Sequence, residues 1–494
     1  MQRTSALIAH PTSLPGPHGM GDFGPVAHAF IDALGRAKVR TWQVLPLCPP
    51  GRGWSPYASP SSLGLNTLLI SLEDLVSRGL LDPSDMKGAP RLTNDRIDFD
   101  AVHTWKMPLL RHAAEHFIRE ASEPDLAMYR EFCARQGAWL VDHADFILAS
   151  RIHGHSAWMR WPSGLRDRVP ESLRDFRSQN PLEREIEKVL QYLAHDQWNT
   201  IRELAGAQGI TILGDVGYYV AHESADVWAH RNLFELGPEG ELRGQGGAPP
   251  DAYAVRGQCW ETPLHRWEAH RDDRFAWWRR RFRMASLQGG RVRLDHFNGV
   301  LRYWAIPEGA TDATEGAWRP GPGAPLLKAL QETLPAGALI AEDLGTETPG
   351  GDELRAEWDI PGMRVLQFGL GPDSAPIHHP HHVARDVGYY TSTHDSPPLE
   401  QWIRELSDPA REELIHLTGS ANAWNVLECV WRSPADLVGA QIQDVLGLGK
   451  SHRMNVPGTA TGNWAFALPR DALSGPWISR LADLNDAAGR SASR

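Results

Sequence analysis

The stretch Gly290-Arg291-Val292-Arg293-Leu294-Asp295-His296-Phe297-Asn298-Gly299 has the pattern of a buried β-strand that ends in charged side chains. Val292 and Leu294 alternate with Arg293 and Asp295. In a strand this alternation places the apolar pair on one face and the charged pair on the other, with the charged residues about 7 Å apart along the chain. Inward charge is costly unless it is paired or needed, so the pattern predicts a catalytic carboxylate, Asp295, held ionised by Arg293. A structural ion pair inside a barrel is the alternative, because such pairs also perturb pKa values.

Short apolar runs of this kind recur along the chain, and three more of them end in an acidic residue: Asp215, Glu342 and Asp395. The predicted strands lie at residues 5–9, 41–47, 209–216, 292–296, 338–342, 363–368, 387–395 and 453–456. Helical segments separate most of them. Eight strands in this arrangement predict the α/β class and a (β/α)₈ TIM barrel, whose chemistry sits at the carboxyl ends of its strands.

The remaining chain predicts insertions into a single catalytic barrel domain that covers residues 1–494. A loop and a helical subdomain occupy residues 51–206 after the second strand, and its helical pattern runs from about residue 99 to residue 206. A second insertion, residues 217–270, follows the third strand. After residue 456 we expect loop and one helix near residues 473–488, which is too little chain for a C-terminal β-sandwich.

Composition excludes several classes of function. The 50 basic and 61 acidic residues give a formal charge of −11 without a basic run, so we expect no nucleic-acid partner. The four cysteines show neither metal-ligand spacing nor a disulfide framework. Because no stretch reaches the ~20 apolar residues of a membrane span and the N-terminus lacks a signal peptide, we expect a soluble, cytoplasmic protein.

Converging carboxylates suit the chemistry of glycosidic bonds, in which one acid protonates the leaving oxygen while another attacks the sugar. A site for Mg²⁺ or another hard cation is the rival interpretation. Basic and imidazole neighbours, Arg293, His296 and His394, disfavour a cation there, so we prefer sugar chemistry. The tract His378-His379-Pro380-His381-His382 also suggests a metal, but its irregular setting favours a solvated loop.

The sequence resembles the 4-α-glucanotransferases (amylomaltases or disproportionating enzymes) of glycoside hydrolase family 77. The motifs that carry the resemblance run nearly from end to end: HPTSLPGPHGMGDFG, WQVLPL, SPYASPSS, WMRWP, GDVGYYVAHESADVW, GAPPDAYAVRGQCW, RLDHFNG, AEDLG, PGMRVLQF, TSTHD, LGLGKSHRMNVPGT and GNW. The resemblance implies malto-oligosaccharides and α-1,4-glucans as substrates, no cofactor and no metal. It is compatible with a monomer or a small homo-oligomer.

The resemblance also implies roles for individual residues. Asp295 would be the nucleophile, Glu342 the general acid and then the base, and Asp395 a stabiliser of the transition state. Residues that would bind substrate are Tyr57, Asp215, Asp251, Trp260, Arg293, His296 and His394. The segment 247–260 would lie over the cleft as a lid, with Asp251 and Trp260 near acceptor sugars.

Three positions depart from the family pattern. Asn298 stands where Arg is usual, Gly217 where Pro is usual, and Ser396-Pro397-Pro398 follows Asp395 where Asn and polar residues are usual. These departures leave subsite contacts and the balance of transfer against hydrolysis open. An α-glucan hydrolase with the same carboxylates is therefore the alternative enzyme. A catalytically silent glucan-binding protein is disfavoured, because binding alone would not need a paired acid and nucleophile.

Overall fold

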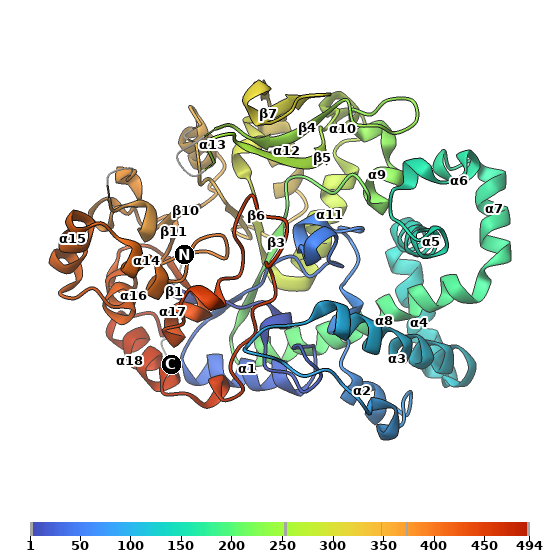
Figure 1. Cartoon of the computed structure of the whole chain (residues 1–494), viewed down its shortest axis with the longest axis horizontal. Coiled ribbons are helices and arrows are strands. Elements are labelled where there is room, and N and C mark those ends of the chain that lie inside the picture. The colour runs from blue at the N-terminus through green and yellow to red at the C-terminus, as the bar shows by residue number, and fades with distance from the viewer. Residues whose placement is uncertain (1–2, 251–253, 347, 372–373, 492–494) are drawn as a thin grey trace.

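The centre of the computed structural model, which describes residues 3–250, 254–346, 348–371 and 374–491, is a sheet of eight parallel strands (Figure 1). In their order across the sheet they are β10 (Gly362–Val365), β11 (Val387–Tyr390), β12 (Leu437–Gln441), β1 (Thr4–Ile8), β2 (Thr41–Gln43), β3 (Thr211–Val216), β6 (Gly290–Leu294) and β9 (Leu339–Ala341). Helices separate most of these strands along the chain. The predicted (β/α)₈ TIM barrel is confirmed.

The barrel closes between β9 and β10, the two ends of the sheet order, by two hydrogen bonds. Ala341 N donates to Pro361 O at 2.8 Å, and Met363 N donates to Oδ1 of Asp343 at 2.7 Å. The Asp343 carboxylate therefore replaces a strand carbonyl at this seam.

The eighth strand differs from the prediction. Residues 453–456 do not form a strand, and the position belongs to β12, which pairs with β1 and β11. Gly439 interrupts the apolar pattern of β12, yet a side chain there would meet the ring of Tyr390 at 2.3 Å. The Tyr390 hydroxyl crosses the barrel interior and donates to Oε1 of Gln43 at 2.9 Å. Gly439 breaks the apolar pattern by which the strand could have been predicted, and packing against Tyr390 inside the barrel requires a glycine there.

Nine helices outside the two insertions accompany the barrel strands in the described part of the chain. They are α1 (Pro25–Arg36), α11 (Ala276–Gly289), α12 (Ala324–Gln331), α13 (Gly351–Glu357), α14 (Leu399–Glu405), α15 (Asp408–Thr418), α16 (Ala423–Arg432), α17 (Ile442–Leu446) and α18 (Trp477–Ala487). α18 lies against α1 and α16. None of the helices in the described part of the chain has the length and apolarity needed to cross a membrane.

The segment between β2 and β3 is largely helical and extends to one side of the barrel (Figure 1). Its helices are α2 (Leu72–Ser77), α3 (Phe99–Glu120), α4 (Glu123–Gln136), α5 (Ala138–His153), α6 (Ser163–Arg166), α7 (Pro170–Gln179) and α8 (Pro181–Ala207). A buried ion pair, Lys106 with Asp22 at 3.4 Å, ties α3 to the loop after β1.

A second sheet, which the sequence pattern did not predict, is built from segments after β3 and after β6. Its antiparallel strands are β5 (Gln258–Pro263), β4 (Gly244–Ala248), β7 (Arg302–Pro307) and β8 (Ala317–Pro320), in that order. The short helices α9 (Ala225–Ala229) and α10 (Trp267–Asp272) flank this region. Within the segment predicted as a lid, the described residues include the antiparallel pairing of β4 with β5.

Candidate active site

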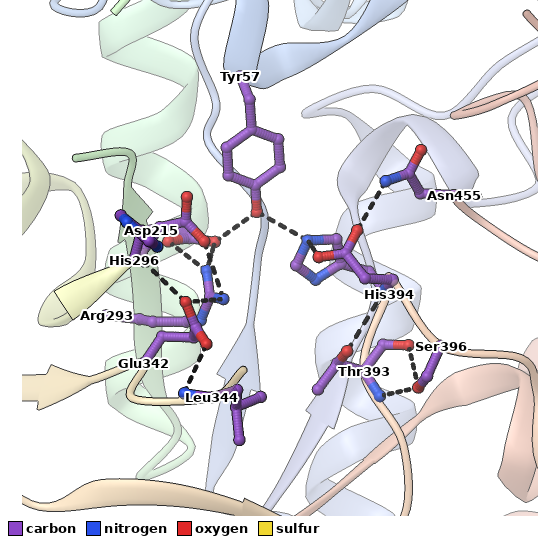
Figure 2. Close-up of polar contacts among 12 residues, drawn as sticks. Tyr57, Asp215, Arg293, His296, Glu342, Leu344, Thr393, His394, Ser396 and Asn455 are labelled. Carbon is purple, nitrogen blue, oxygen red and sulfur yellow. Dashed lines mark hydrogen bonds and ion pairs between the residues drawn. The ribbon is translucent and has the colours of Figure 1, made fainter. Parts of the chain in front are cut away.

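Arg293 lies at the centre of a group of carboxylates that come from different barrel strands (Figure 2). Its Nη1 donates to both oxygens of Asp215, at 2.9 and 2.7 Å. Its Nη2 lies 3.0 Å from Oδ1 of Asp295 and 3.8 Å from Oε2 of Glu342. The guanidinium is 4% exposed, so these ionic contacts are formed largely out of water, where they are stronger.

The barrel backbone holds these acids at the carboxyl ends of the strands. Asp215 belongs to β3, whereas Asp295 and Glu342 come directly after β6 and β9. Asp295 N donates to Val216 O, and Glu342 N donates to Leu294 O, each at 3.0 Å. The parallel hydrogen bonding thus continues up to the acidic residues, and their side chains leave rigid backbone rather than free loops.

The Asp295 and Glu342 carboxylates are close neighbours. Because one oxygen of each lies 3.0 and 3.8 Å from the same Arg293 nitrogen, those two oxygens are at most about 7 Å apart. Retaining glycosidases place their two carboxyl groups about 5–5.5 Å apart and inverting enzymes about 6.5–9.5 Å. The bound of about 7 Å between these two oxygens is compatible with the retaining separation.

Glu342 is held by two backbone amides. His296 N donates to Oε2 at 2.8 Å and Leu344 N donates to Oε1 at 2.9 Å. His296 reaches this position with φ of +52°, the left-handed conformation. Burial raises the pKa of Glu342, and Arg293 and the two amides oppose that rise.

Asp295 shares this environment. Its pKa is raised well above the ordinary value by burial, while Arg293 acts in the opposite direction. The nearby carboxylates of Asp215, Glu342 and Asp395 add to the rise. The imidazoles do not relieve this negative charge, because burial lowers the pKa of His296 to about 4 and also lowers that of His394.

Tyr57, which the sequence alone marked only as a loop aromatic, joins the two sides of the site (Figure 2). Its hydroxyl donates to Oδ2 of Asp215 at 2.7 Å and lies 3.0 Å from Nε2 of His394. The two rings stack at 5.6 Å with an angle of 8° between their planes. Burial, reinforced by Asp215, raises the pKa of Tyr57 well above its usual value, so the phenol keeps the proton that it donates.

Asp395 lies in the loop between β11 and α14 and has 42% of its side chain exposed. Its Oδ2 is 3.3 Å from Nε2 of His394. Asn455 Nδ2 donates to its Oδ1 at 2.6 Å, and Arg453 Nη2 donates to its main-chain oxygen at 2.8 Å. The segment predicted as the eighth strand is therefore a loop that holds the third acid.

Trp464 was missed by the sequence reasoning in the same way as Asn455 and Arg453. Its ring lies 5.7 Å from that of Tyr57 and 6.2 Å from that of His394. Each of these three residues is separated from its partner by tens to hundreds of positions in the chain. Their occurrence in the motifs RMNVPGT and GNW was the available signal.

Trp260 of β5, which belongs to the segment predicted as a lid, lies beside His296. Its ring contacts that of His296 edge to face at 5.0 Å and that of Tyr219 at 5.8 Å. Nε2 of His296 is buried and has no hydrogen-bond partner among the described residues. Asp251, the other predicted lid residue, lies outside the described residues.

The departures from the family pattern occupy structural positions around the acids. Asn298 Nδ2 donates to Leu344 O at 3.1 Å, next to the amide that holds Glu342. The main-chain oxygen of Gly217 accepts from Nη2 of Arg281 at 2.6 Å. Ser396 Oγ accepts from Thr393 N at 2.8 Å and donates to Thr393 O at 3.1 Å.

The histidine tract at residues 378–382 lies beyond β10. His378 is buried and its Nδ1 accepts from Val365 N at 3.2 Å, which fixes the loop to the end of that strand. Neither in this tract nor elsewhere in the described residues do three or more His, Cys, Asp or Glu side chains form a group that could hold a metal ion.

Comparison with known proteins gives consistent matches over almost the whole chain. A family model described as 4-alpha-glucanotransferase matches residues 9–471. The chain is 38% identical to the 4-alpha-glucanotransferase of Synechocystis sp. over 99% of its length and 98% of that protein. It is 36% identical to the Thermus thermophilus 4-alpha-glucanotransferase, over 99% of both chains.

Among solved structures, the chain is similar to the amylomaltase from Streptococcus agalactiae in complex with acarbose. The TM-score is 0.95 with 28% identity, and the match covers 99% of this chain and 100% of that one. The amylomaltase from Corynebacterium glutamicum gives a TM-score of 0.78 at 21% identity, over 98% of this chain and 75% of that one, which is a likeness of fold.

Proposed function

The chain belongs to the family of 4-α-glucanotransferases, and from this premise we propose that Asp295, Glu342 and Asp395 carry its reaction by a retaining double displacement. In the first step the Asp295 carboxylate attacks the anomeric carbon of a donor glucan, the glycosidic C–O bond breaks, and Glu342 protonates the leaving oxygen. In the second step the hydroxyl of an acceptor glucan replaces Asp295 at that carbon and gives its proton to Glu342.

The observation that carries this proposal is the contact of one buried guanidinium with both carboxylates. The two oxygens that face Arg293 are at most about 7 Å apart, which suits direct attack better than a water held between the acids.

The distribution of charge supports separate roles for the two acids. Among the described residues, Arg293 is the cation within ion-pair distance of Asp215, Asp295 and Glu342. One positive charge against three carboxylates in a largely dehydrated site favours retention of a proton on one of them. Asp215 accepts two bonds from Arg293, and Asp295 is nearer to it than Glu342 is. Although burial raises the pKa of both acids, the shorter contact of Arg293 with Asp295 favours the negative charge on Asp295 and the proton on Glu342.

The remaining predicted residues would orient sugars. Asp215, His296 and His394 would bind hydroxyls of the donor glucose, with Asp395 strengthening its contact as the transition state forms. Tyr57 would stack beside that glucose, and Trp260 would offer its ring face to an acceptor, together with Asp251. The acarbose complex of the Streptococcus agalactiae amylomaltase supports a glucan chain as the ligand.

The test uses maltotriose as sole substrate, with glucose, total reducing ends and product lengths measured together. Transfer exchanges one glycosidic bond for another, so we expect glucose and a ladder of longer oligosaccharides with little rise in total reducing ends. Water outnumbers every sugar hydroxyl, and transfer succeeds only where the site positions the acceptor and excludes water. A rise in reducing ends that matches the glucose released, without longer products, would identify a hydrolase instead.

We also expect a cytoplasmic location and a monomer or small homo-oligomer. Size-exclusion chromatography with light scattering measures the second of these directly.

A further inference from the structure

The loop that carries His394 and Asp395 begins and ends at one buried carboxylate. Asp444 of α17 is fully buried. Its Oδ2 accepts hydrogen bonds from the hydroxyls of Thr391, at 2.7 Å, and Ser392, and its Oδ1 accepts from Leu399 N at 2.7 Å. Thr391 directly follows β11 and Leu399 begins α14, so a single side chain joins both ends of the loop.

Further contacts within the loop leave it little freedom. Ser396 Oγ closes a turn onto both main-chain groups of Thr393 (Figure 2). Gln367 Nε2 donates to Pro397 O at 2.8 Å. Pro397 and Pro398 fix their own φ angles. With its ends tied by Asp444, this segment presents Asp395 from a nearly rigid turn.

The choice of an aspartate at this position is costly for the fold. Burial raises the pKa of Asp444 to about 6; the nearby Glu400 adds to the rise, and the three hydrogen bonds to Asp444 do not reverse it. Its bonding partners are two hydroxyls and an amide, all neutral. Because the folded state holds this proton more tightly than the unfolded chain, ionising Asp444 as the pH rises through about 6 reduces stability. An uncharged side chain would meet a purely structural need at lower cost.

We propose that Asp444 is a positioning residue for the transfer reaction: it anchors both ends of the 391–399 loop and so holds Asp395 and His394 against the donor sugar. This inference rests on the proposed role of Asp395. Asp444 itself touches neither the acids nor the space between them; it acts through the loop.

Two variants of Asp444 should reduce activity to different extents. In Asp444→Asn the amide nitrogen faces hydroxyls that must rotate to accept from it, whereas Asp444→Ala removes all three bonds. We expect kcat for maltotriose disproportionation to fall by roughly tenfold in the first and about 10²-fold in the second, as for a misplacement of about 1 Å. KM should stay within about twofold, because contacts made mainly in the transition state affect kcat. The melting temperature of Asp444→Asn well above pH 6 should not fall.

Asp145→Asn is the matched control. Asp145 is also fully buried, but it is held by Arg177 and Arg184 in the helical insertion. Its replacement should lower the melting temperature and leave kcat per folded molecule unchanged, the reverse of the pattern expected for Asp444→Asn.

A double-mutant cycle with Asp395→Asn gives the decisive readout. If Asp444 acts through the loop that carries Asp395 and His394, the two losses should be less than multiplicative, and the double variant should be well under about tenfold slower than Asp395→Asn alone. Full multiplication of the two losses, or an unchanged kcat in Asp444→Asn with a lowered melting temperature, would overturn the inference. If Asp444→Ala does not fold, Asp444→Asn and the cycle still decide. Near-normal activity of Asp395→Asn would instead contradict the proposed function itself, so the two failures are distinguishable.

Discussion

At the scale of single residues, the site depends on the guanidinium of Arg293, which can contact several carboxylates at once through a planar group where an ammonium cannot. Arg293 uses Nη1 for both oxygens of Asp215 and Nη2 for Asp295 and Glu342, so its planar fork fixes three acids at once. The neighbouring histidines stay neutral because they are buried. We propose that they hydrogen-bond sugar hydroxyls rather than balance charge.

Replacement of Asp295 tests its proposed role as the nucleophile. Asp295→Asn preserves shape and removes the attacking carboxylate, so we expect turnover of maltotriose to fall by on the order of 10⁴-fold or more. Initial rates of glucose release measure the loss, and circular dichroism with thermal unfolding checks that the fold persists. A variant that retains near-normal turnover would rule out Asp295 as nucleophile.

The pH dependence of Glu342→Gln tests the role of Glu342 as general acid. The general acid must be protonated, so activity falls as the pH rises through the pKa of Glu342, which burial places above its ordinary value. In Glu342→Gln this basic limb of the kcat/KM profile should disappear together with most activity on maltotriose.

A donor whose leaving group needs no proton is the control for that variant. With α-maltotriosyl fluoride the Glu342→Gln enzyme should still form the covalent intermediate. If the basic limb survives in Glu342→Gln, the acid is another residue.

At the scale of elements, the position where the barrel closes, between β9 and β10, differs from the other strand pairs. There a side chain, Asp343, accepts a hydrogen bond that a strand carbonyl would otherwise accept. Asp343 accepts from Met363 N and lies 2.9 Å from both Arg355 Nε and Arg364 Nη1. All three charged groups are buried. This network also borders Glu342, so the seam sets the position of the acid.

Asp343→Asn should therefore destabilise the protein strongly. The variant leaves the two buried guanidiniums with Asp352, whose side chain is 69% exposed, as their remaining carboxylate, and breaking a buried ion pair typically costs about 3–5 kcal/mol. Equilibrium unfolding in urea measures the change. The exposed pair Glu131–Arg135, 3.8 Å apart, supplies the control, because Arg135→Gln should have no measurable effect. Equal stability of the two variants would show that the seam is held by other contacts.

At the scale of the whole molecule, the insertions after β2, β3 and β6 surround one end of a barrel that already holds the acids. The hairpin of β4 and β5 brings Trp260 against His296, and the loop after β12 brings Asn455 against Asp395. Elements from both halves of the chain thus contribute side chains to the same site, and in the proposed mechanism they would help to exclude water from the covalent intermediate.

A reaction carried by these side chains alone should resist chelation. We expect exhaustive dialysis against EDTA to leave the rate of maltotriose disproportionation unchanged, because the acids contact Arg293 directly where a hard cation would otherwise sit. Loss of activity that Mg²⁺ or Ca²⁺ restores would favour the metal interpretation.

The sequence by itself was enough to predict much of the architecture and part of the site. Alternation in residues 290–299 placed Arg293 and Asp295 on one face of a strand, and apolar runs that end in acids located Asp215, Glu342 and Asp395. These signals are local: a period of two shows which face is buried, and the end of an apolar run shows where a strand stops. The motifs that resemble the family then added Tyr57, His296, His394 and Trp260.

Only the tertiary structure decided how distant segments meet. β12 was missed because Gly439, which Tyr390 requires, breaks its apolar pattern, and residues 453–456 imitate a strand by alternation alone. Asn455 and Asp444 have no local signature, since their partners lie about 50 to 60 residues away in the chain. Closure of the barrel brings the ends of strands together, and side-chain packing across its interior selects which segment supplies the last strand. Sequence periodicity carries no information about such contacts.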